Sequence, residues 1–181
     1  MTELDRLYQA DSPFALFSLP AVYEIDRAAL QERYLQLTRL THPDFANPDD
    51  ASQVQAQELS ARINQAYTLL ADDLQRAQYL LDSPSGPAET PDASDADAIP
   101  LCPDILEQIF DLREGLTQAR MSDDQPQLLQ FRQTAQTWQQ QLMEQIAAAF
   151  AITPLSPPQR QQLRTHLNTA RYLTRIVAAA K

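Results

Sequence analysis

The chain has 181 residues, of which 44% are hydrophobic and 21% charged, and its formal net charge is -10. This composition indicates one or two compact domains and excludes a disordered chain. With two glycines, one cysteine and two histidines, the chain has too few of these residues for a glycine-rich phosphate loop, a disulfide framework or a Cys/His zinc site. We therefore expect no cofactor and no bound metal.

The negative charge also disfavours nucleic acid or an anionic membrane surface as a partner, because both attract clustered Lys and Arg. No apolar run approaches the roughly 20 residues that a membrane-spanning helix needs. The first twelve residues are acidic, unlike a cationic signal or transit peptide. We expect a cytoplasmic protein that binds neither nucleic acid nor a membrane.

Apolar residues recur at three- and four-residue spacing, while the strict alternation of a strand is missing, so the sequence predicts an all-α fold. Asp11 or Ser12 caps a short helix that ends at Pro20. Asp26 caps a second helix that ends before residue 43. A third helix is expected over about 51–71 and a brief fourth around 77–81. We assign residues 1–83 to an N-terminal helical domain with a short extension at its start.

Residues 84–103 are rich in proline and acidic side chains and contain no basic residue, so we interpret them as a solvated linker. Residues 104–181 show three helical patterns, at about 104–121, 125–150 and 157–180. With short connections these predict an antiparallel three-helix bundle. The last helix begins with Ser156-Pro157-Pro158-Gln159, a capping box with proline at the first helical position.

The tripeptide His42-Pro43-Asp44 lies between the second and third predicted helices. On its own, this tripeptide indicates an ordinary turn. In its context it resembles the loop of a J-domain, in which a hairpin of two helices presents His-Pro-Asp. The context consists of residues 16–20 (Leu-Phe-Ser-Leu-Pro), Tyr34, residues 63–67 (Ile-Asn-Gln-Ala-Tyr) and Leu70.

The resemblance extends to the HscB family of iron-sulfur co-chaperones over about residues 13–178. It is carried by the Leu-Phe-x-Leu-Pro opening, residues 76–81 (Arg-Ala-Gln-Tyr-Leu-Leu) and residues 112–114 (Leu-Arg-Glu). It implies a protein that is not an enzyme. The J-domain would stimulate the ATPase of a DnaK/HscA-class chaperone, and the bundle would deliver the IscU-type iron-sulfur scaffold to it, assisting maturation of iron-sulfur proteins.

Two alternatives stay open. One is a J-domain protein whose bundle recruits a different client or dimerises. The other is an enzyme that uses His42 and Asp44 as an acid/base pair, although the sequence suggests no nucleophile or third group beside them.

The resemblance implies that the chaperone-binding residues are His42, Pro43 and Asp44, with Arg33 and Arg39 of the preceding helix. Asp44 would accept charge-assisted hydrogen bonds from a chaperone arginine, Pro43 would stiffen the loop and His42 would orient it. The residue after the tripeptide is phenylalanine rather than Lys or Arg, and glutamates accompany the arginines of the helix. We therefore expect docking that is weaker and less salt-sensitive than that of a basic J-domain.

On the first helix of the bundle, Leu106 and Phe110 lie roughly 100° from the apolar core stripe, and on the last helix Tyr172 lies about 180° from Leu163. The pattern alone leaves open whether these surplus apolar residues pack internally or bind a partner. The resemblance implies that the scaffold-binding positions are Leu106, Phe110, Asp111, Glu114 and Tyr172.

Four further residues carry separate expectations. We expect Trp138 of the middle helix in the core and His166 of the last helix packed or half-exposed. Ser18 stands where the HscB family often has glycine, and Gly115 where it often has a charged residue. Both departures are expected to alter packing without changing the role of the protein.

Overall fold

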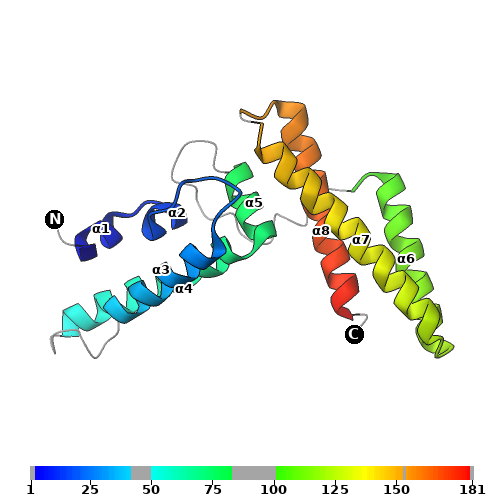
Figure 1. The fold of residues 1–181 in the computed structure, drawn as a ribbon, viewed down its shortest axis with the longest axis horizontal. Coiled ribbons are helices and arrows are strands. Elements are labelled where there is room, and N and C mark those ends of the chain that lie inside the picture. Colours follow the sequence, from blue (N-terminus) through cyan, green and yellow to red (C-terminus); the bar gives the residue numbers. More distant parts are fainter. Residues whose placement is uncertain (1–2, 42–49, 83–100, 153, 180–181) are drawn as a thin grey trace. The chain divides into compact units, whose positions relative to one another are not determined.

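The structure is a computed structural model, and it describes residues 3–41, 50–82, 101–152 and 154–179. Every regular element in these ranges is a helix, which confirms the predicted all-α class (Figure 1). The chain divides into two compact units, residues 1–87 and 88–181. Each unit is described by itself.

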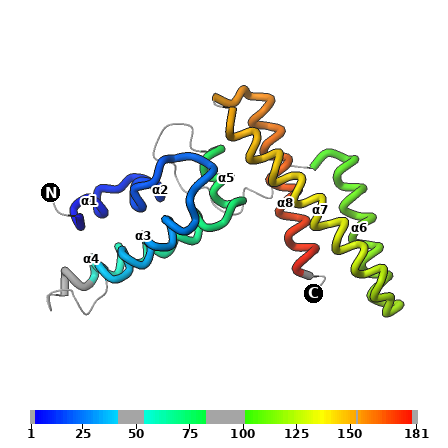
Figure 2. Tube along the Cα trace, viewed as in Figure 1, coloured from blue at the N-terminus to red at the C-terminus, as the bar shows by residue number. Residues whose placement is uncertain are grey.

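The N-terminal unit contains five helices: α1 (Glu3–Gln9), α2 (Pro13–Phe17), α3 (Arg27–Leu40), α4 (Asp50–Ala71) and α5 (Asp73–Asp82). Helices α3 and α4 lie side by side in opposite directions, and α2 contacts both (Figures 1 and 2). The core between these helices is made of large apolar side chains, among them Phe14, Phe17, Leu37, Ile63 and Leu70.

The predicted caps of this unit are present. Ser12 Oγ accepts a hydrogen bond from Ala15 N at 3.1 Å, and Asp26 Oδ1 accepts from the backbone N–H groups of the first turn of α3. Ser18 ends α2 in the left-handed conformation, with φ 56°. Because an L side chain is unfavourable in this conformation, glycine would end α2 here with less strain than serine.

Helix α1 was not predicted. It has one buried residue, Leu7, and is held mainly by residues distant in sequence. Arg62 of α4 donates to the carbonyl oxygen of Ala10 at 2.7 Å, and Arg33 of α3 pairs with Glu3. The short N-terminal extension is therefore part of the folded unit.

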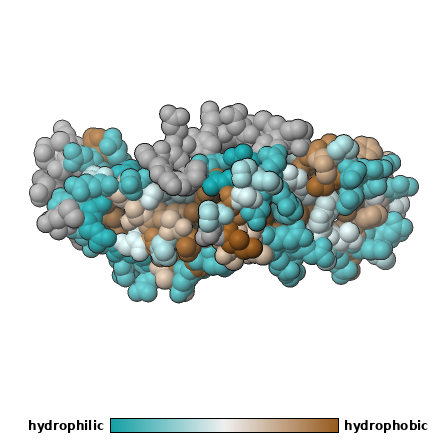
Figure 3. Space-filling model, turned by 90° about the horizontal axis from the view of Figure 1, so that it is seen from above, coloured by the Kyte–Doolittle hydropathy of each residue, from teal (hydrophilic) through white to brown (hydrophobic). Residues whose placement is uncertain are grey.

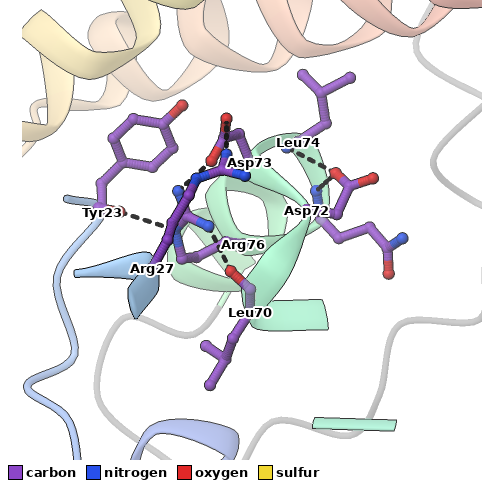
Figure 4. Close-up of polar contacts among 8 residues, drawn as sticks. Tyr23, Arg27, Leu70, Asp72, Asp73, Leu74 and Arg76 are labelled. Atoms are coloured by element: carbon purple, nitrogen blue, oxygen red, sulfur yellow. Dashed lines mark hydrogen bonds and ion pairs between the residues drawn. The ribbon is translucent and has the colours of Figure 1, made fainter. Parts of the chain in front are cut away.

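A buried arginine links the start of α3 to the end of the unit. Arg76 is 3% exposed, and its Nε donates to the carbonyl oxygen of Tyr23 at 2.7 Å (Figure 4). Its other nitrogens donate to the Leu70 carbonyl oxygen and to Asp73, and its guanidinium lies over the Tyr23 ring. Burial, and then the negative charge of Asp73, raises the pKa of Tyr23 to about 12.

The C-terminal unit is a bundle of α6 (Pro103–Met121), α7 (Gln125–Phe150) and α8 (Pro157–Ala179). The three helices alternate in direction, and α7 contacts both of its neighbours (Figure 2). This arrangement confirms the predicted antiparallel bundle. At the start of α8, Gln159 Oε1 accepts from Ser156 N at 2.9 Å, which is one half of the predicted capping box.

The predicted core stripes are largely buried, but Trp138 is not in the core. Its side chain is partly exposed and lines a groove between α6 and α7. Gly115 of α6 lies under the ring of Phe131, so that an added Cβ would come within 2.6 Å of Cε1. The absence of a side chain at Gly115 therefore lets the ring of an α7 residue lie against α6.

Candidate functional site

The residues His42, Pro43 and Asp44 lie outside the described residues, but the helices on either side of them are described. The rings of Tyr34 on α3 and Tyr67 on α4 stack with centroids 4.1 Å apart. The Tyr34 hydroxyl donates to Asn64 Oδ1 at 2.9 Å. These contacts set the register between the two helices that carry the connection.

The arginines of α3 do not form one basic stripe. Arg27, Arg33 and Arg39 are six residues apart, which places them about 120° from one another around the helix. Arg27 pairs with Asp73 at 2.6 Å, and Arg33 pairs with Glu3 at 2.6 Å, whereas Arg39 is exposed in the last turn. Carboxylates of α1 and α5 thus neutralise part of the positive charge of α3.

Exposed apolar side chains also occur on the C-terminal unit. Figure 3 shows one face of the molecule, on which hydrophilic residues predominate and hydrophobic residues form separate patches. Phe110 is 65% exposed, Leu106 is 48% exposed and Tyr172 is 37% exposed. Exposed aromatic and aliphatic side chains that lie close together are typical of a protein-interaction site.

The structure brings these three residues together. Leu106 and Phe110 of α6 and Tyr172 of α8 line one groove of about 630 Å³. The apolar residues Ile109, Leu116, Leu128 and Ile176 also line it. Of the two readings of the surplus apolar residues, this geometry favours a partner site, because the side chains border an open groove instead of filling the core.

The two carboxylates of the predicted site lie elsewhere on α6. Asp111 lines the groove between α6 and α7 together with Trp138, and Glu114 is exposed one turn after Phe110. The α6–α8 groove is instead lined by Arg113, Arg120 and Arg175, which the sequence reasoning did not single out. Their signal was present in the spacing, because Arg113 and Arg120 follow Leu106 by seven and fourteen residues and so share its side of the helix.

Potential metal ligands do not cluster in the part of the chain that the structure describes. Within the described ranges, no group of three or more His, Cys, Asp and Glu side chains is placed to hold a metal ion. Cys102 is exposed at the start of α6. His166 is partly buried, and its burial lowers the pKa of the imidazole. None of the described helices is long and apolar enough to cross a membrane.

Comparison with protein families assigns a family model to each unit. Residues 22–79 match the DnaJ domain, and residues 101–181 match the HSCB C-terminal oligomerisation domain. The first match begins just before Tyr23 and ends just after Arg76. The buried guanidinium of Arg76 joins these two residues by its hydrogen bond to the Tyr23 carbonyl oxygen. The second spans the whole three-helix bundle.

Comparison with individual proteins gives relatives that cover both units. The chain is 30% identical to the co-chaperone protein HscB homolog of Haemophilus ducreyi, over 92% of this chain and 91% of that protein. Its fold is similar to chaperone HscB from Vibrio cholerae (TM-score 0.74, 24% identity, 93% of this chain and 94% of that one). It is also similar to human co-chaperone protein HscB (TM-score 0.77, 24% identity, 93% and 80%). The chain therefore belongs to the HscB family of co-chaperones.

Proposed function

We propose that this chain stimulates the ATPase of a DnaK/HscA-class chaperone through His42, Pro43 and Asp44, and delivers an IscU-type iron-sulfur scaffold to it. The proposed role is to assist the maturation of iron-sulfur proteins. The observation that supports it best is the α6–α8 groove, where exposed apolar residues meet in the same chain as a DnaJ domain.

The chaperone side of this proposal requires no catalysis by the co-chaperone. A loop that contacts one conformation of the chaperone better than another shifts the chaperone toward that conformation. Asp44 supplies a carboxylate for a chaperone arginine, and a charge-assisted hydrogen bond of this kind is roughly twice as strong as a neutral one. The stacked tyrosines of α3 and α4 support this role, because they hold the helices that carry the loop.

The client side rests on burial of the apolar residues around the groove. Full burial of a phenylalanine side chain contributes about 1.5–3 kcal/mol, and Phe110 has most of its surface available. Leu106 and Tyr172 border the same groove and add to the apolar area that a partner covers. Asp111 and Glu114 lie on sides of α6 that do not line this groove. They would contribute more to the orientation of the bound scaffold than to its affinity.

The client side is tested by calorimetric titration of the full chain with an IscU-type scaffold. Phe110→Ala should weaken binding by about 10- to 100-fold, since it removes an apolar anchor. Leu129→Ala is the matched control, because Leu129 is 56% exposed on α7 and does not line the groove. If the folded protein shows no binding, the chain is a J-domain protein with a different client.

The chaperone side is tested by the steady-state ATPase rate of a DnaK-class chaperone. We expect His42→Gln to abolish stimulation and to leave scaffold binding intact, because the two sites lie in separate units. Phe110→Ala should do the reverse. If either substitution removed both activities from a protein that keeps its helical circular dichroism, the proposed division of roles would be wrong.

A further inference from the structure

The charged residues that line the α6–α8 groove all have the same sign. Arg113 and Arg120 of α6 and Arg175 of α8 line it, and no aspartate or glutamate is among its described lining residues. This local excess of positive charge occurs in a chain whose formal net charge is -10. The Arg175 guanidinium lies 5.9 Å from the centroid of the Tyr172 ring, so one wall combines an aromatic face with a cation.

The acidic residues of α6 lie on a different side of the helix. At 100° per residue, the four carboxylates of this helix centre about 150° from Arg113 and Arg120. Leu106 and Phe110 lie between the two charged stripes and form an apolar ridge. The acidic stripe consists of Asp104, Glu107, Asp111 and Glu114.

We propose that the groove receives an acidic apolar segment of the client: apolar side chains that cover the Leu106 and Phe110 ridge, with carboxylates directed at Arg113 and the neighbouring arginines. This inference rests on the client binding proposed above and adds the charge of the segment that is bound. A basic segment does not fit equally well, because closing the groove over it would bring like charges against Arg113, an exposed residue of the groove lining.

This charge arrangement orients the client. Arginine binds a carboxylate in a bidentate fork, so each contact fixes direction as well as position. A segment docked in the reverse orientation would place its carboxylates near the acidic stripe of α6, where like charges repel. The apolar ridge then supplies affinity, while the two charged stripes select one of the two orientations.

The test is calorimetric titration of the full chain with an IscU-type scaffold at low and high salt. Arg113→Gln removes one positive charge from an exposed groove residue and should weaken binding about fivefold at low salt. Arg113→Glu should weaken it further, and high salt should reduce both effects. The control is Gln162→Glu, at an exposed α8 position away from the groove lining. It lowers the net charge as much as Arg113→Gln does, and the variant should bind like the unmodified protein.

Three results would overturn the inference, and they separate it from the proposed function. If Phe110→Ala weakens binding while Arg113→Gln, Arg113→Glu and Arg175→Gln do not, client binding stands and the acidic segment is refuted. If Arg113→Glu strengthens binding, the bound segment is basic. If the unmodified, folded protein does not bind the scaffold, the proposed client and this inference fail together.

Discussion

Replacement of Gly115 by alanine tests whether the contact between α6 and α7 depends on a missing side chain. A Cβ at this position would lie 2.6 Å from Cε1 and 2.9 Å from Cε2 of Phe131, so the ring must move. Overpacking of this kind costs about 1–3 kcal/mol. Alanine is favoured over glycine within a helix by about 1 kcal/mol. The clash outweighs the propensity, and we expect a net loss of about 1 kcal/mol in the free energy of unfolding of the C-terminal unit.

The assay is urea denaturation followed by tryptophan fluorescence. Trp138 is the single tryptophan of the chain and lies on α7, so its emission reports the C-terminal unit alone. Phe131→Leu in the Gly115→Ala background shortens the side chain that causes the clash. The double-mutant cycle should then show a compensating coupling of about 1 kcal/mol.

The refuting result is equally specific. If Gly115→Ala stabilises the unit by the full helix propensity, and does so whether residue 131 is phenylalanine or leucine, the ring does not depend on this glycine. The close approach in the structure would then have no energetic consequence.

Three further predictions concern single residues. Arg76→Met should destabilise the N-terminal unit by about 3–5 kcal/mol, because it removes a buried donor to two carbonyl groups and Asp73. Thermal unfolding followed by circular dichroism measures this loss, with the Trp138 transition as an internal control. A loss below about 1 kcal/mol would contradict the prediction. Glu3→Gln should release Arg33 and lower the concentration needed for half-maximal chaperone stimulation by about threefold at low salt; an unchanged value would mean that Arg33 does not contact the chaperone. Burial lowers the pKa of His166, so the unfolded state binds the proton more readily, and the stability of the C-terminal unit should fall as pH drops below 6.5. His166→Gln should flatten this pH dependence of stability, measured by urea titrations. If the variant and the unmodified protein lose stability with falling pH at the same slope, His166 is not the group responsible.

Sequence reasoning was most successful where a local signal determines the structure. Caps and proline positions predicted the starts of α2, α3 and α8, and helical periodicity predicted the bundle stripes. Helix α1 was missed because it is short and is held by Arg33 and Arg62, which are distant in sequence. Trp138 was misplaced because periodicity indicates which side of α7 faces its neighbours, but not how closely those neighbours cover an indole ring.

The candidate site, too, could be predicted from the sequence only as far as single-helix patterns allow. The surplus apolar residues Leu106, Phe110 and Tyr172 could be identified from spacing, since each lies away from the core stripe of its own helix. That they meet in one groove depends on how α6 and α8 pack, which no single-helix pattern contains. For the arginine lining, the spacing places Arg113 and Arg120 on the Leu106 side of α6, but only the packing of α6 with α8 brings Arg175 to the same groove.

The hydrogen bond from Arg76 to the Tyr23 carbonyl also has a consequence during synthesis. These residues are 53 positions apart, and the ribosome makes Tyr23 first. Helix α3 can therefore form and pair with α4 before the residue that secures its entry has left the ribosome. Because domains fold as units during synthesis, the N-terminal unit reaches its final state only after α5 emerges.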